Sequence, residues 1–290
     1  WYNDNVDLGF SLDIPSYPDN LRERAAHVLR QNNEVMLDHL KPHVELINVL
    51  HGNSSDINTF YKACEIVHNK KIARMSFGDL YFGTVVDAIS RFIRLVEFLE
   101  KNYAGHYKHI HILGIFNIRV LLPLIYVMNR KFPHIQFTSD STTYLQHTLN
   151  NNYVQHPFLD KAMSFTPVGY VAIPSYKGSS SNRLMPCGCP VCSQLKYMDL
   201  FSYNRGFIVY YLMLHNALQM VNYVGLMNRL AQESTCEDYK EICLSHIKGT
   251  RSITLEAKAT FDFVDHYMNH GIDSAHTRFK HWSTQDNLLF

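Results

Sequence analysis

Short apolar runs alternate with longer amphipathic stretches through the first half of the chain. The short runs are rich in β-branched residues, which favour strands, and the longer stretches repeat apolar positions at helical spacing. This alternation is typical of βα units that build a parallel sheet. The predicted strands cover residues 6–13, 44–50, 72–77, 109–115 and 135–139, and the predicted helices cover residues 20–40, 56–68, 85–101 and 118–131.

Polar residues or glycines stand at the end of each predicted strand. They are Asp13, His51 with Gly52, Gly78 with Asp79, Gly114, and Asp140. In a (β/α) barrel the carboxyl ends of the strands form the active-site face. Five consecutive units of this kind favour an α/β protein of the (β/α)8 TIM-barrel type, with an open parallel sheet as the alternative. The sequence contains no glycine-rich dinucleotide fingerprint and no P-loop, which argues against nucleotide cofactors.

The pattern changes after Asp140. Residues 168–173 are predicted as a β segment, residues 207–231 as a helix, and residues 237–270 as helical. The residues after 270 are mostly polar and are predicted as a tail. We therefore expect three parts: a partial barrel that carries the active site at 1–165, a metal-binding subdomain with helices at 166–270, and a polar tail at 271–290.

Composition and charge limit the compartments and the partners that fit this protein. Of the 290 residues, 46% are hydrophobic, yet no long apolar run predicts a membrane span. The formal net charge is +1, so a nucleic-acid partner would need a local basic patch, for which the loop 177–183 is the best candidate. Six cysteines without a regular disulfide pattern fit a reducing compartment, so we expect a cytoplasmic protein, or one of the host cytoplasm if a phage encodes it. Because the sequence begins with Trp1, we expect a segment of a longer chain.

One short motif carries the most specific chemistry. Cys187, Cys189 and Cys192 stand at C-x-C-x-x-C spacing, and His215 follows further along the chain. Three thiolates and one imidazole can close a tetrahedral Zn²⁺ site, and the intervening glycine and proline allow the tight turn that it requires. Because protein ligands would fill all four positions, the zinc is predicted to be structural. The alternative is coincidence or disulfide pairing, which the closeness of Cys187 and Cys189 disfavours.

Several segments match motifs of one family, in the order in which the family has them. They are LDIPSYPD at 12–19, VLHGN at 49–53, the strand end at 73–78, HILGI at 111–115, FTSDSTTY at 137–144, and CGCPVC at 187–192 with LHN at 214–216. With these motifs the chain resembles the tRNA-guanine transglycosylases, in particular the archaeal and phage members that handle 7-deazaguanines. The matches extend over most of the chain.

The resemblance implies a (β/α)8 barrel with an appended structural zinc subdomain, of which this sequence holds the barrel strands from the fourth onward. It also implies that Asp140 is the covalent nucleophile and that Asp13 holds the incoming base. His51 stands where the family has glutamine, and with Gly78 it is a candidate for substrate binding. Each of these residues also has a simpler interpretation: Asp13 and Asp140 as helix caps, His51 as a loop histidine, and Gly78 as part of a turn.

The chemistry of these residues agrees with the resemblance. Replacing a purine base on a sugar requires a nucleophile for C1′ and a stabiliser of an oxocarbenium-like transition state. The carboxylate of Asp140 can do both through a covalent glycosyl intermediate. The carboxylate of Asp13 can accept hydrogen bonds from the ring N–H and the amine of a guanine-like base. We therefore expect a pentosyltransferase that exchanges guanine for a 7-deazaguanine in nucleic acid.

The resemblance also indicates the partners. They are the free 7-deazaguanine base and a nucleic acid, with DNA favoured over tRNA because no segment after His270 is long enough for the RNA-binding module of the archaeal enzymes. A homodimer or assembly with a partner subunit is expected, and contact with a membrane is not. One alternative function is a non-catalytic accessory subunit that binds nucleic acid or a catalytic partner. Another is an unrelated barrel enzyme with a zinc site.

Overall fold

The computed structural model describes residues 6–12, 14, 19–51, 56–80, 83–114, 117–140, 152–154, 170–172, 188–193, 205–247 and 251–283. Its contacts divide the chain into two compact units. The first contains residues 1–140 and 259–290, and the second contains residues 141–258. The predicted site residues Asp13 and Cys187 lie outside the described residues.

The first unit is built from five strands and the helices that connect them. In chain order these are β1 (Leu8–Phe10), α2 (Asp19–His39), β2 (Glu45–His51), α3 (Ile57–Val67), β3 (Arg74–Gly78), α4 (Val85–Tyr103), β4 (His109–Ile112), α5 (Ile118–Lys131) and β5 (Gln136–Ser139). The strands run parallel and pair in the order β1-β2-β3-β4-β5. The predicted alternation of strands and helices is confirmed.

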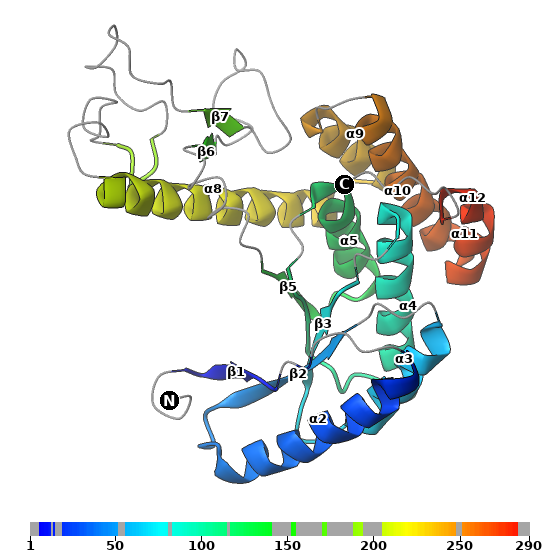
Figure 1. Cartoon of the computed structure of the whole chain (residues 1–290). Helices are drawn as coiled ribbons and strands as arrows, with labels where there is room; N and C mark the ends of the chain where they lie inside the picture. Colours follow the sequence, from blue (N-terminus) through cyan, green and yellow to red (C-terminus); the bar gives the residue numbers. More distant parts are fainter. Residues whose placement is uncertain are drawn as a thin grey trace, which may run out of the picture. The chain divides into compact units, whose positions relative to one another are not determined.

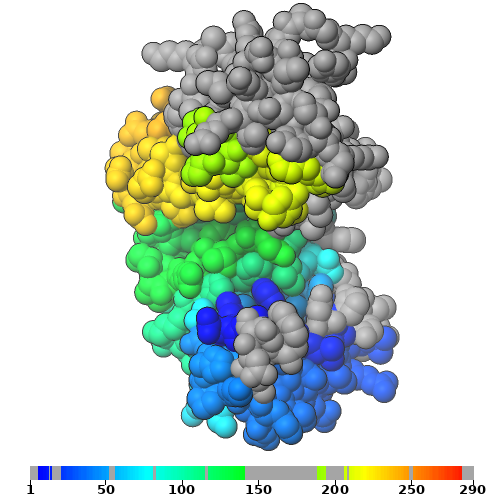
Figure 2. All heavy atoms as spheres, turned by 90° about the vertical axis from the view of Figure 1, so that its left-hand side faces the viewer, coloured from blue at the N-terminus to red at the C-terminus, as the bar shows by residue number. Residues whose placement is uncertain are grey.

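The helices α2 to α5 lie on one face of this sheet (Figure 1). Because the strands follow one another in order and crossovers between parallel strands are right-handed, each connecting helix returns on the same side. Figure 2 shows the same succession from another direction, as colours that pass from blue to green along the unit. Barrels carry their helices on one face of the sheet in this way, whereas a doubly wound sheet has helices on both faces.

The core of the first unit lies between the sheet and these helices. Phe77 of β3 contacts Phe92 of α4, which also contacts Phe137 of β5. Ile112 of β4 is in register with Phe77 and therefore points to the same side of the sheet, toward the helices. Ile110 shares this side, and both isoleucines are fully buried. Burial of a side chain of this size contributes about 1.5–3 kcal/mol, so this apolar layer holds the strands to the helices.

The opposite face of the sheet, here called the inner face, is polar along β3, β4 and β5, whereas β1 and β2 also contribute apolar side chains to it. Arg74 of β3 contacts Glu45 of β2 and His109 of β4. Thr138 of β5 lies within hydrogen-bond distance of both His109 and His111. The interior of a (β/α) barrel is usually filled with branched apolar residues, so the polar part of this face would be unusual in a barrel.

The sheet curves around its inner face. Phe10 of β1 contacts His111 of β4, with ring centroids 5.4 Å apart. In a flat sheet with strands about 4.8 Å apart, β1 and β4 would lie on the order of 14 Å from each other. The contact therefore requires the strong curvature of a barrel wall. Among the described residues β1 pairs with β2 alone and β5 with β4 alone, so closure of an eight-stranded barrel is not seen.

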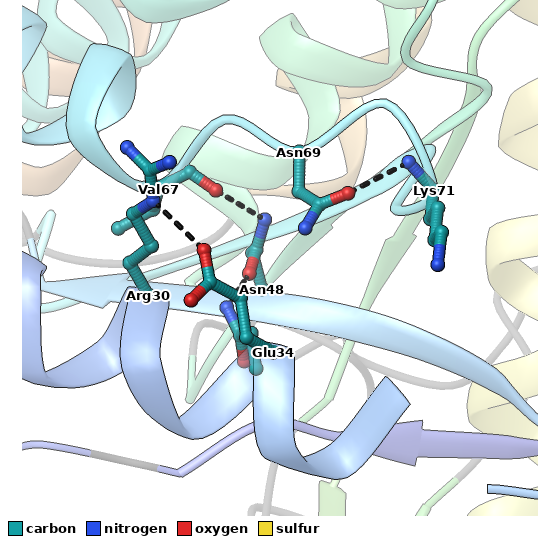
Figure 3. A network of polar contacts seen from close by, with 7 residues as sticks. Arg30, Glu34, Asn48, Val67, Asn69 and Lys71 are labelled. Atoms are coloured by element: carbon teal, nitrogen blue, oxygen red, sulfur yellow. Dashed lines mark hydrogen bonds and ion pairs between the residues drawn. The ribbon is translucent and has the colours of Figure 1, made fainter. Parts of the chain in front are cut away.

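Asn48, in the middle of β2, is a buried polar residue on the helix side of the sheet (Figure 3). Its side-chain oxygen accepts a hydrogen bond from the amide of Asn33 in α2. Its own amide donates to the carbonyl oxygen of Val67, at the end of α3, over 3.3 Å. A buried amide costs free energy unless it is hydrogen-bonded. Asn48 meets this requirement by tying its strand to the helices before and after it.

The last helices complete the first unit. α10 spans Arg251–His270, and its residues from 259 onward belong to this unit. α11 (Ile272–Arg278) and α12 (Lys280–Ser283) follow and contact α4. Arg94 of α4 forms an ion pair with Asp273 at 2.9 Å, and Ala275 is fully buried. Residues 272–283 fall in the predicted polar tail but form helices. Their packing depends on a few apolar side chains such as Ala275, which give no periodic signal in the sequence.

The second unit combines a strand pair with helices. β6 (Asn152–Val154) and β7 (Tyr170–Ala172) are antiparallel, and β6 contacts α8 (Arg205–Glu233). α9 (Cys236–His246) begins after Thr235, whose hydroxyl accepts a hydrogen bond from the Asp238 N–H at 3.2 Å. The helix predicted at 207–231 is confirmed as α8. Of the described helices, none is both long and apolar enough to cross a membrane.

Candidate functional site

His51 and Gly78 are in register as the last residues of the neighbouring strands β2 and β3. The ring of His51 lies against Gly78, so closely that a Cβ on Gly78 would come within 2.7 Å of its Cε1 and Nδ1. Nδ1 of His51 lies 2.8 Å from Oδ2 of Asp79, and the guanidinium of Arg22 donates to the carbonyl oxygen of His51. Asp79 has a φ of 50°, which turns the chain away from the strand. The structure thus brings His51 and Gly78 together.

We expect alanine at position 78 to displace the His51 ring. The added methyl group would occupy the space of the ring, so Gly78→Ala should break the contact between His51 and Asp79 and lower the free energy of unfolding by about 1–3 kcal/mol. Denaturant unfolding measures this effect. The matched control is Gly225→Ala in α8, where nothing lies within 4 Å of the added Cβ and stability should be unchanged or higher. Equal stabilities for the two variants would contradict the steric role of Gly78.

Asp140 directly follows β5 and continues its ladder, because its backbone N–H donates to the carbonyl oxygen of Ile112 at 3.3 Å. Its Oδ1 accepts a hydrogen bond from the backbone N–H of Gly114 at 2.6 Å. The same oxygen lies 3.4 Å from Nε2 of His111. Gly114 has a φ of 71°, which glycine adopts without strain. The side chain of Asp140 is 57% exposed and is therefore accessible to a reactant.

The carboxyl ends of the strands carry three of the predicted substrate and catalytic residues. His51, Gly78 and Asp140 end or follow β2, β3 and β5, and these strands share one parallel sheet. Asp13, the predicted base-binding residue, lies outside the described residues. Residues of a common site must lie at the same edge of the sheet, as these three do. Their roles in binding and catalysis stay predictions.

Two histidines of β4 adjoin this site and were not among the predicted site residues. Burial, together with the positive charge of Arg74, lowers the pKa of His109 to about 4. Burial also lowers the pKa of His111, although the carboxylate of Asp140 acts in the opposite direction. Both rings are therefore neutral at pH 7. The signal in the sequence was the alternation His-Ile-His-Ile at 109–112, in which polar residues occupy every second position of an otherwise buried strand.

A second candidate site lies in the second unit. Nδ1 of His215, on α8, is 3.4 Å from Sγ of Cys189 and 3.0 Å from Sγ of Cys192. In a tetrahedral site with Zn–S near 2.3 Å and Zn–N near 2.1 Å, such atoms would be about 3.6 Å apart. The hydroxyl of Tyr211 donates to Sγ of Cys192 at 3.0 Å, a contact that orients the sulfur.

These three residues fit a metal ion. Their ligand atoms all lie within 4.8 Å of one another, and Cys192 and His215 are buried. The local turn is fixed by the carbonyl oxygen of Cys189, which accepts hydrogen bonds from the backbone N–H groups of Cys192 and Ser193 at 2.9 Å. Cys187, the fourth predicted ligand, lies outside the described residues. The cluster of two thiols and one imidazole is of the kind that binds zinc.

The sequence was compared with known protein families and with curated proteins. No family model matches the sequence. Among curated proteins, the tRNA-guanine(15) transglycosylase of Methanococcus maripaludis (strain C5) is 23% identical to this chain over 265 residues. The match covers 90% of this chain and 37% of that protein, so the chain spans little more than a third of the length of this relative. Along nearly its whole length, the chain is thus similar to a tRNA-guanine transglycosylase, in agreement with the resemblance seen in the motifs.

Proposed function

We propose that this protein is a guanine transglycosylase, a pentosyltransferase that exchanges guanine in a nucleic acid for a free 7-deazaguanine base. The position of Asp140 is the observation that carries the proposal. Its exposed carboxylate stands at the carboxyl end of β5, in the segment that resembles the nucleophile motif of the family. The similarity to a tRNA-guanine transglycosylase supports the same class of reaction.

In the proposed reaction the carboxylate of Asp140 attacks C1′ of the target nucleotide. A carboxylate oxygen bonds to C1′ as the bond from C1′ to guanine breaks, and guanine leaves with the bonding electrons and gains a proton. The incoming base loses a proton and reverses these steps. Among the described residues, both contacts of the Asp140 side chain involve Oδ1, which favours Oδ2 as the attacking atom.

The base is proposed to bind between Asp13 and His51. The two oxygens of Asp13 match the ring N–H and amine of guanine-like bases. Because a carboxylate such as that of Asp79 accepts hydrogen bonds, Nδ1 of His51 carries the hydrogen in their contact. The His51 ring is proposed to contact the base beside the two oxygens of Asp13. Gly78 contributes by leaving room for this ring.

The metal cluster and the curved sheet are also given roles in this enzyme. We propose that Cys187, Cys189, Cys192 and His215 hold a structural zinc ion, which when bound would fix the turn at 188–193 to α8. The donor set supports this assignment. We also propose that the five strands belong to a (β/α)8 barrel, which the sequential order and the curvature of the sheet support.

The function is tested by guanine exchange. The full-length protein is incubated with labelled guanine and, in separate reactions, with tRNA and with double-stranded DNA. We expect label to enter one polymer and to be displaced by unlabelled 7-deazaguanine. The polymer that is labelled identifies the substrate and decides between DNA, the initial expectation, and tRNA, which the name of the relative favours. Absence of label in both polymers would reject the enzyme and favour the non-catalytic accessory subunit.

A further inference from the structure

A line of hydrogen bonds crosses the inner face of the sheet and ends beside Asp140. NH1 of Arg74 lies 3.1 Å from Nδ1 of His109, and Nε2 of His109 lies 2.5 Å from Oγ1 of Thr138. The same hydroxyl oxygen lies 2.8 Å from Nδ1 of His111. Nε2 of His111 then faces Oδ1 of Asp140 at 3.4 Å. The line thus runs from β3 to β4 and β5, returns to His111 of β4, and ends at the candidate nucleophile.

The chemistry of Arg74 at one end of this line and of the Asp140 carboxylate at the other assigns a direction to each bond. Arginine has donors and no acceptor, so Nδ1 of His109 accepts and the hydrogen of the neutral ring is on Nε2. That Nε2–H donates to Thr138. Among the described residues the remaining neighbour of the Thr138 hydroxyl is Nδ1 of His111. A hydroxyl can accept two hydrogen bonds as well as donate one, so the Asp140 carboxylate decides the direction: it is an acceptor that faces Nε2 of His111, which favours a hydrogen on Nε2 and leaves Nδ1 to accept from Thr138.

We propose that His111 is a positioning residue for Asp140 and that Arg74 sets its tautomer through His109 and Thr138. This proposal rests on the proposed function of Asp140 as the nucleophile. With Nε2–H of His111 and the backbone N–H of Gly114 both directed at Oδ1, the carboxylate is held with Oδ2 toward the reactant.

The distances and burial support this role. A separation of 3.4 Å is longer than a formed hydrogen bond, and catalytic hydrogen bonds are often long before the substrate binds and shorten afterwards. His111 is 7% exposed, and the low pKa values of both histidines keep the rings neutral, as the line requires. A charged His109 would lose the acceptor that faces Arg74.

The tautomer can be measured without any enzymatic activity. Two-bond ¹⁵N–¹H correlation spectra of the histidine-labelled protein distinguish protonated from unprotonated ring nitrogens, and His109→Gln and His111→Gln identify the two residues. We expect His109 and His111 both to carry hydrogen on Nε2 at neutral pH. Hydrogen on Nδ1 of His111 in the wild-type protein would overturn the proposal.

Variants of Thr138 link the tautomer to the reaction. Thr138→Val keeps the shape but removes the hydroxyl, so we expect a mixture of tautomers at His111 and a kcat lowered about 10- to 100-fold at nearly constant KM. Thr138→Ser restores the hydroxyl and should restore both. Ser76→Ala is the matched control, because Ser76 is fully buried in register with His111 and its hydroxyl has no hydrogen bond among the described residues.

Two variants of His111 test the other end of the line, and their results can be interpreted even if Thr138→Val does not fold. The amide nitrogen of glutamine at position 111 reaches the place of Nε2, whereas asparagine reaches only the place of Nδ1. We expect His111→Gln to retain most of kcat and His111→Asn to lose about as much as Thr138→Val. Equal kcat in all variants would overturn the proposal. If the wild-type protein shows the expected tautomers but no exchange, the hydrogen-bond line stands and the proposed function fails.

Discussion

Asparagine in place of Asp140 is expected to lower guanine exchange by about 10⁴-fold or more while the free base still binds. Asn keeps the size of the side chain and an oxygen that can accept from the Gly114 N–H, but it lacks the charge needed to attack C1′. The measurement is denaturing electrophoresis after incubation with labelled nucleic acid. Wild-type protein should form a denaturation-resistant adduct, and the variant should form none.

The matched control is Asp56→Asn. Asp56 precedes α3 and accepts a hydrogen bond from the Asn58 N–H at 2.9 Å, which is the geometry of a helix cap. Since asparagine caps helices about as well as aspartate, exchange by this variant should equal that of the wild type. Undiminished exchange by Asp140→Asn, with an adduct still present, would place the nucleophile on another residue.

Removal of the metal is expected to unfold the second unit. In small zinc sites the binding free energy is on the order of 10 kcal/mol and contributes directly to folding. Cys192→Ser, or a strong chelator, should therefore release zinc and expose the backbone amides of α8 to hydrogen exchange. Elemental analysis measures the zinc, and mass spectrometry after deuterium labelling measures the exposure. The sheet of the first unit should stay protected.

Cys236→Ser provides the control for this experiment. Cys236 begins α9 and is not part of the Cys189, Cys192 and His215 cluster. This variant should keep stoichiometric zinc and a protected α8. Wild-type protein that contains no zinc, or an α8 that stays protected after chelation, would contradict a structural metal at this site.

The order of elements in the first unit could be predicted because each has a strong periodic signal. α4, for example, buries ten of its residues and begins at a capping box formed by Thr84 and Asp87. The short elements could not be predicted in this way. β6 has only three residues, and α11 and α12 depend on contacts with α4 that are distant in sequence. Their stability comes from tertiary packing, to which local sequence patterns are insensitive.

Individual residues of the candidate site could be predicted from the sequence, whereas the contacts between pairs of them could not. Asp140 stands out by its motif, and His51 and Gly78 by their place at strand ends. The contact of the His51 ring with Gly78 depends on the register of two strands, as does the bonding of His109 to Thr138. Sequence patterns show which side chains share a face but not which of them meet across strands.

The alternation of histidine and isoleucine in β4 also bears on how the chain folds. A shift of this strand by one residue against β3 would turn His109 and His111 toward the apolar layer and place Ile110 and Ile112 on the inner face. The shifted pairing would leave two imidazoles buried without their hydrogen-bond partners, at a cost of about 1–3 kcal/mol each. Misalignment of β4 is thus penalised on both faces at once, which favours the native register of its pairs with β3 and β5.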